Sequence, residues 1–193
     1  MIRLFLFFLC LSVLAPTHAA EAGQWETLQN CRLLKKETYD GDSFHVRHDG
    51  KEYIFRLLYV DTPEKKELGL TERTTEQARY WKIYKKDLYL LAEEALVFTG
   101  QKLSAPFTIQ TRWEDAKGNS QLPRYYAIVT TSDNQDLASL LLENGLARIH
   151  GRPVEAPDGR AGKKVVEDLE KIEALAKTQK RGAWAFPSRG TKK

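Results

Sequence analysis

The sequence contains few of the residues that cross-link small proteins. Only two cysteines, Cys10 and Cys31, occur among its 193 residues. Two thiols are too few for a structural zinc site. Because Cys10 lies in an N-terminal segment that we expect to be removed, no disulfide can form within the mature chain. We expect Cys31 to be a small buried apolar side chain; a link between two chains is the less favoured alternative. Stability must then come from an ordinary hydrophobic core.

Glycine and proline are also few, and positive and negative charges nearly balance. Twelve glycines and seven prolines exclude collagen and low-complexity repeats, and 10% aromatic residues with balanced charge exclude a wholly disordered chain. Thirty Lys+Arg against 26 Asp+Glu give a net charge of +4, which is compatible with an anionic partner but does not identify one. The length suits one compact domain rather than two.

The longest apolar run lies at the N-terminus, at residues 4–14, after the positive charge of Arg3. This run is shorter than the roughly 20 residues that a membrane-spanning helix needs, and small residues follow it. The pattern predicts a signal peptide at residues 1–20, and an uncleaved membrane anchor is the weaker alternative. Cleavage after Ala19, Ala20 or Ala22 fits equally well.

A signal peptide implies that the mature protein is secreted or periplasmic, with no stable membrane association after cleavage. We expect one folded domain at residues 21–187, followed by a solvated basic tail at residues 188–193.

Five short segments show strand-like patterns of apolar residues. These candidate strands are residues 31–38, 43–46, 51–60, 107–113 and 124–131. The tripeptide His48-Asp49-Gly50 predicts a hairpin turn between the second and third strands, and the polar stretch 114–123 predicts a hairpin between the last two.

Helical periodicity occurs in residues 72–102, 136–144 and 162–178. The first of these is long for a globular helix and predicts a break near residues 83–86, and Gly145 is placed to cap the second. Together the elements indicate a small β-barrel with helices, an α+β fold in a single domain.

Three segments carry polar groups that need an explanation. Asp40-Gly41-Asp42 places two carboxylates on one side of an extended chain, although a solvated turn is the simpler interpretation of that segment alone. Arg56 lies inside an apolar run that leads directly into Asp61-Thr62-Pro63-Glu64, and a buried arginine is costly unless an anion meets it. A structural ion pair with these acids is one explanation. Arg124 opens a strand and by itself is an ordinary edge arginine.

Taken together, these segments suit one kind of chemistry. Carboxylate and carbonyl oxygens are the ligands that Ca²⁺ prefers. Two arginines can bind one phosphate, and a remaining glutamate can orient and deprotonate water. The combination indicates a site that cleaves phosphodiesters.

The same segments are similar to a known family. The runs Asp40–Ser43, Phe55–Glu64 and Arg124–Val129, followed by Leu142–Ala147 and Gly182–Trp184, resemble the staphylococcal (micrococcal) nuclease family. The resemblance extends from about residue 30 to residue 186.

This resemblance implies a five-stranded Greek-key OB-fold β-barrel with about three helices. To that pattern the sequence adds a helical insert after the Asp61-Thr62-Pro63-Glu64 motif. It also implies a Ca²⁺-dependent hydrolase of DNA and/or RNA, an endonuclease. We expect the mature chain to be a monomer. The roles that it implies for individual residues are these: Asp42, Asp61 and the backbone carbonyl of Thr62 hold the calcium, Asp40 lies beside them, Glu64 is the general base, and Arg56 and Arg124 bind the scissile phosphate.

The sequence departs from the family pattern in two places. Leu122 and Gly151 stand where the family has tyrosines that stack on the nucleotide, and Tyr125 and Tyr126 are candidates to replace them. The insert at residues 65–93 interleaves aromatic and basic residues, which suits base stacking, although we favour a helix packed on the barrel with its charges in solvent. A catalytically inactive OB-fold protein that binds single-stranded nucleic acid is the alternative function.

Overall fold

A computed structural model describes residues 23–36, 39–65, 71–118 and 120–188. Within them, five strands form a closed barrel in the order β1-β2-β3-β6-β5. Their bounds are β1 Glu26–Leu34, β2 Ser43–His48, β3 Lys51–Leu57, β5 Phe107–Asp115 and β6 Arg124–Thr130. The predicted five-stranded barrel is present, whereas the predicted signal peptide and most of the basic tail lie outside the described residues.

The turn between β2 and β3 was predicted correctly. His48 pairs with Lys51 across it, so Asp49 and Gly50 form the two-residue connection. Both have positive φ values, 46° and 76°, as this tight turn requires, and glycine adopts them at little steric cost. The hairpin fixes the register that places Arg56 opposite Ser43.

The parallel pairing of β3 with β6 positions the two arginines that were singled out in the sequence. Ile54 pairs with Arg124, and Arg56 pairs with Tyr126. Arg56 and Arg124 therefore lie on neighbouring strands of the barrel.

The prediction for the first strand was wrong at both ends, because β1 begins at Glu26 and ends at Leu34. The pairing of β1 with β5 shifts register between Leu28 and Cys31, and Asn30 between them has a φ of 57°. This irregularity separates the buried residues Leu28 and Cys31 by three positions, which hides the two-residue period of a strand. Cys31 is fully buried as expected, and burial raises the pKa of its thiol to about 12.

Two short strands were not predicted. β4 (Val60–Asp61) and β7 (Arg148–Ile149) form a separate antiparallel pair in which Asp61 faces Arg148. Strands of two residues are too short to show alternation in the sequence. The pair joins the segment after the barrel strand β3 to the segment after α3.

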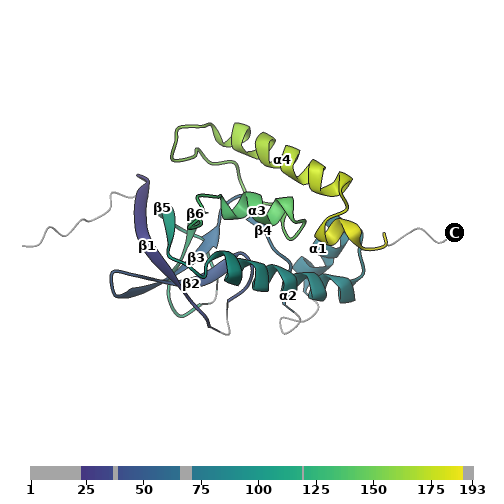
Figure 1. The fold of residues 1–193 in the computed structure, drawn as a ribbon, viewed down its shortest axis with the longest axis horizontal. Coiled ribbons are helices and arrows are strands. Elements are labelled where there is room, and N and C mark those ends of the chain that lie inside the picture. Colours follow the sequence, from purple (N-terminus) through teal and green to yellow (C-terminus); the bar gives the residue numbers. More distant parts are fainter. Residues whose placement is uncertain (1–22, 37–38, 66–70, 119, 189–193) are drawn as a thin grey trace, which may run out of the picture.

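The described residues contain four α-helices and one short 3₁₀ helix, close to the expected three helices and insert. Their bounds are α1 Glu72–Trp81, α2 Lys85–Lys102, α3 Leu137–Glu143, α4 Gly162–Thr178 and η2 Gly182–Ala185. The predicted break falls between α1 and α2, where Lys82 adopts a left-handed conformation with φ of 57°. Figure 1 shows the barrel at one end of the molecule, with α2 and α4 extending away from it on either side of α3.

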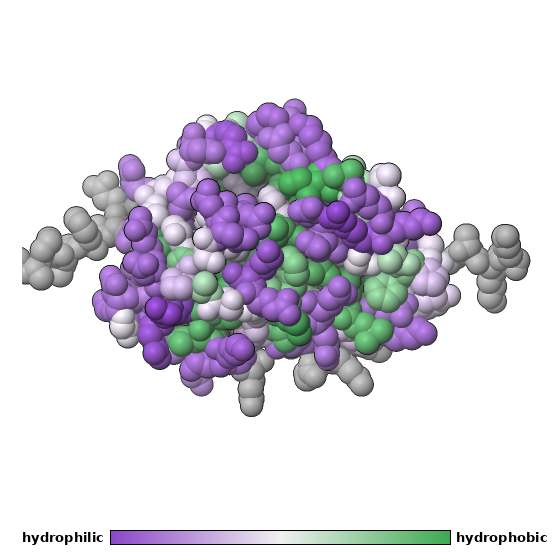
Figure 2. All heavy atoms as spheres, viewed as in Figure 1, coloured by the Kyte–Doolittle hydropathy of each residue, from purple (hydrophilic) through white to green (hydrophobic). Residues whose placement is uncertain are grey.

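A continuous hydrophobic core joins the barrel to the helices. Its fully buried side chains include Phe44, Phe55, Ile109, Leu141 and Leu146. Hydrophilic residues cover most of the face seen in Figure 2, with smaller areas of hydrophobic residues between them. Among the described helices, none has the length and apolar character needed to cross a bilayer.

Candidate active site

The turn before β2 brings the first two acids to the site. The carboxylate of Asp40 accepts hydrogen bonds from the backbone N–H groups of Asp42 (3.1 Å) and Ser43 (2.7 Å). A Cβ on Gly41 would lie only 2.9 Å from Ala95 Cβ and from side-chain atoms of Thr62, so glycine lets this turn pack closely against α2. Asp42 is consequently buried at the edge of the barrel. Burial, followed by the neighbouring charge of Asp42, raises the pKa of Asp40 well above its ordinary value.

Arg56 of β3 meets the anions that its buried position requires. Its Nη2 lies 2.8 Å from Asp61 Oδ1 and 3.3 Å from Asp42 Oδ2. The ion pair with the acids at the end of the apolar run is therefore present. Phosphate binding by Arg56 stays a prediction.

Asp61 is the centre of the site and is completely buried. Four side chains donate to its carboxylate: Arg56, Arg73, Arg148 through Nε at 2.9 Å, and Gln77 through Nε2 at 2.9 Å. Burial alone would raise the pKa of Asp61, but the charge of Arg73, the hydrogen bond from Gln77 and the charges of Arg56 and Arg148 together hold it below its ordinary value. The negative charge of Asp61 is thus balanced by its guanidinium partners although the side chain is buried.

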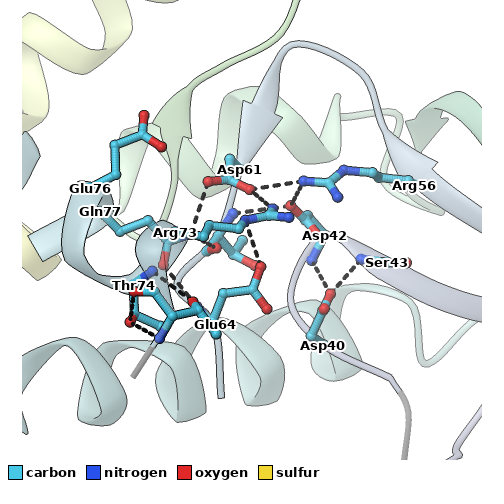
Figure 3. A network of polar contacts seen from close by, with 12 residues as sticks. Asp40, Asp42, Ser43, Arg56, Asp61, Glu64, Arg73, Thr74, Glu76 and Gln77 are labelled. Carbon is cyan, nitrogen blue, oxygen red and sulfur yellow. Dashed lines mark hydrogen bonds and ion pairs between the residues drawn. The ribbon is translucent and has the colours of Figure 1, made fainter. Parts of the chain in front are cut away.

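Glu64 lies beside this centre, held by residues of α1 (Figure 3). Its Oε1 is 2.7 Å from Arg73 Nε, and its backbone N–H donates to Gln77 Oε1 at 3.1 Å. Gln77 Nε2 also donates to the Thr62 carbonyl at 2.8 Å, so this one side chain orders the whole segment 61–64. Burial raises the pKa of Glu64, and the negative charges of Asp42 and Asp61 add to the rise while Arg73 opposes it.

Arg124 lies at the edge of the site, away from the centre. Its guanidinium donates to the carbonyls of Lys117 (2.8 Å) and Ala116 (3.4 Å) and to Ser43 Oγ (3.3 Å). The loop before β6 therefore wraps around this side chain. Because Ser43 adjoins Asp42 and pairs with Arg56, Arg124 remains next to the acidic cluster.

A cavity of about 390 Å³ opens beside the cluster. Arg56, Arg73, Tyr126, His150 and Arg152 are among the residues that line it. Tyr125 instead packs in the barrel wall, with its ring 5.1 Å from that of Trp113 and 6.5 Å from that of Phe55, measured between centroids. Of the two candidates to replace the missing nucleotide-stacking tyrosines, Tyr126 is thus the one that faces this cavity.

Three residues of the site were missed in the sequence: Arg73, Gln77 and Arg148. Our interpretation of the insert's charges as a solvated face is wrong for Arg73, which contacts Asp61 and Glu64. Arg73 and Gln77 are four residues apart, and this spacing places both on one side of a helix. It is a weak sequence signal that the two side chains act at one place. Arg148 gives no such signal, since 87 residues separate it from Asp61.

The donor types of the site suit calcium, since Asp42, Asp61 and the Thr62 carbonyl are all oxygen ligands. In their present arrangement, however, no three acidic, histidine or cysteine side chains of the described residues converge as a metal site. Both oxygens of Asp61 receive guanidinium hydrogen bonds, and the Thr62 carbonyl accepts from Gln77. A calcium ion would fit the donors but would have to compete for them with cationic side chains.

Comparison with known proteins adds one match. The family model for staphylococcal nuclease homologues matches residues 54–186, more than half of the chain. No curated protein is significantly similar to the chain. The family match includes the segments that carry Arg56, Asp61, Glu64 and Arg124, as well as α1 and Arg148. The chain therefore belongs to the staphylococcal nuclease homologue family, as its motifs predicted.

Proposed function

We propose that this protein is a calcium-dependent nuclease that hydrolyses phosphodiester bonds of DNA and/or RNA. Family membership supports a nuclease-type hydrolase with a nucleic-acid substrate. The observation that carries the finer proposal is the meeting of Asp42, Arg56, Asp61 and Glu64 at one end of the barrel, next to an open cavity.

The proposed roles follow from the position of each group. Asp42, Asp61 and the Thr62 carbonyl would hold the calcium ion, with Asp40 behind them ordering the turn. When bound, the ion would supply positive charge that polarises the phosphate. Glu64 would orient a water molecule and accept its proton.

The arginines would neutralise the charge that develops on the phosphate. Arg56 lines the cavity and is rigidly held by two acids. Arg124 approaches from the neighbouring strand, and its present partners are neutral carbonyl and hydroxyl oxygens, which a phosphate can replace.

We also propose that the mature chain acts as a monomeric endonuclease after export to the periplasm or the medium. The apolar N-terminal run behind Arg3 supports export. The open cavity, lined from several segments, supports cleavage within a strand rather than only at its end.

A cleavage assay tests the proposal against the alternative of an inactive nucleic-acid-binding barrel. Supercoiled plasmid and single-stranded oligonucleotides are incubated with the protein in Ca²⁺, and in parallel in EGTA. We expect nicking and shortening in Ca²⁺, none in EGTA, and recovery when Ca²⁺ is restored. Tight binding without cleavage under all these conditions would favour the inactive binder, and full cleavage in EGTA would remove the calcium assignment.

A further inference from the structure

Arg73 projects into the acidic cluster from a fixed position at the start of α1. Thr71 and Thr74 form a reciprocal capping box there, with the Thr74 N–H donating to Thr71 Oγ1 at 3.1 Å and the Thr71 N–H donating to Thr74 Oγ1 at 3.0 Å. One turn later, Glu76 binds Arg148 at 2.9 Å and thereby anchors the same helix. The helix therefore holds Arg73 against the cluster without relying on Arg73 itself.

The guanidinium of Arg73 bridges the two acids on which the proposed chemistry depends. It contacts Asp61 Oδ1, and its Nε is 2.7 Å from Glu64 Oε1. Figure 3 shows this side chain reaching from α1 across Glu64 towards Asp61 and Asp42. One positive group thus joins a proposed calcium ligand to the proposed base.

Arg73 differs from the other two arginines on Asp61 in how easily it can move away. The side chains of Arg56 and Arg148 are 9% and 3% exposed, whereas that of Arg73 is 35% exposed and lines the open cavity. If Arg73 swings out, its charge returns to water, and Asp61 keeps two buried guanidinium partners. The guanidinium groups of Arg56 and Arg148 cannot reach water in this way without first leaving their buried positions.

We propose that Arg73 is a tethered cation that competes with Ca²⁺ for Asp61, so that calcium binds only by displacing its guanidinium from Asp61 and Glu64. This inference rests on the proposed calcium-dependent function. It assigns the insert a role in setting the calcium concentration at which the site fills. Arg73 is in this sense a positioning residue, because it holds Asp61 and Glu64 until the ion displaces it from Asp61.

The test is a calorimetric titration of Ca²⁺ into chelator-treated protein, comparing wild type with Arg73→Gln. The matched control is Arg79→Gln, which removes the same charge from an exposed position on the same helix. Losing a partly exposed ion pair that opposes binding should tighten calcium affinity roughly three- to fivefold in Arg73→Gln. Arg79→Gln should bind calcium within about twofold of wild type, the change that distant, screened charge allows.

A second measurement reports displacement directly. In ¹⁵N-labelled wild type, the arginine Nε–H signal that disappears in Arg73→Gln belongs to Arg73. Calcium should shift this signal towards the position of a solvated arginine, whereas the signals of the buried Arg56 and Arg148 should stay at positions typical of hydrogen-bonded guanidinium groups.

The possible failures are distinguishable. Equal calcium affinity in wild type and Arg73→Gln, or an Arg73 signal that calcium does not move, would overturn the inference while leaving calcium-dependent cleavage intact. Weaker calcium binding in Arg73→Gln would also overturn it and make Arg73 a supporting residue. Failure of all three proteins to bind calcium would overturn both proposals. The expected affinities without any plasmid cleavage would overturn the nuclease proposal alone.

Discussion

Asp42 and Asp61 have the same proposed role as calcium ligands, yet their surroundings predict very different effects on stability. Asp61 is fully buried between Arg56, Arg73 and Arg148. Asp42 is also buried, but its contacts are longer: 3.3 Å to Arg56 and 3.2 Å to the backbone N–H of Thr62. We therefore compare Asp61→Asn with Asp42→Asn, two substitutions that keep side-chain size and remove one negative charge.

The expected magnitudes follow from the partners left behind. Asp61→Asn leaves Arg56 and Arg148 buried without their principal anion, and removing one member of a buried ion pair costs about 3–5 kcal/mol. Asp42→Asn weakens two long hydrogen bonds, and a lost hydrogen bond of this kind costs roughly 1–2 kcal/mol. For a domain of this size, where 1 kcal/mol corresponds to roughly 2–4 °C, Asp61→Asn should lower the thermal midpoint by about 6–20 °C.

The assay is urea unfolding of both variants and of wild type in EGTA, in which circular dichroism and tryptophan fluorescence monitor the loss of structure. If the two spectroscopic signals give coincident transitions and each variant keeps the wild-type m value, the change in midpoint reports a change in stability alone. A parallel calcium titration should show impaired binding in both variants. The reasoning is refuted if Asp61→Asn is as stable as wild type, or if Asp42→Asn is the more damaging change.

Four further outcomes are expected. The pKa of Asp61 lies below its ordinary value in the folded protein. Its contribution to stability is therefore present above about pH 3.9 and is lost as pH falls through the native pKa. Acid unfolding of Asp61→Asn should depend less on pH below about pH 4 than acid unfolding of wild type. Glu64→Gln should lower single-turnover cleavage roughly 10²–10⁴-fold with little change in substrate affinity, and unchanged turnover would mean that another group activates the water. Arg124→Ala should lower turnover about a hundredfold while the melting midpoint hardly changes, because the oxygens that Arg124 binds are neutral and its loss leaves no buried charge unpaired. Arg124→Lys should recover little of the rate. Gly41→Ala should destabilise the fold by about 1–3 kcal/mol, because the new methyl meets Ala95 at 2.9 Å; a wild-type melting curve would show that α2 can give way there.

Much of the fold could be predicted because its signals are local. The β2–β3 hairpin depends on Asp49-Gly50, and the break between α1 and α2 occurs where an overlong periodic segment had to end. The start of β1 could not be predicted, since the irregularity at Asn30 removes the alternation that identifies a strand. β4 and β7 are defined only by each other and leave no pattern in the sequence.

The residues of the site likewise fall into those marked by local motifs and those brought in by long-range pairing. Asp42, Arg56, Asp61 and Glu64 lie in short motifs, and the structure brings them together, although their catalytic roles stay predictions. Arg148 reaches Asp61 only because β7 pairs with β4, a contact between distant parts of the chain. A single sequence carries no local mark of such a partnership.

The charge balance around Asp61 also sets an order of assembly for a chain made from its N-terminus. Its guanidinium partners lie at positions 56, 73 and 148, and the barrel closes only when β6, which ends at Thr130, pairs with β3. A nascent chain that stops short of β7 lacks both Arg148 and the β4–β7 pairing that places Arg148 on Asp61. The long-range pairings therefore make folding a late event in synthesis, completed after the segment beyond α3 has emerged from the ribosome. If the chain is exported as we propose, this delay favours its passage through the membrane before the barrel can close.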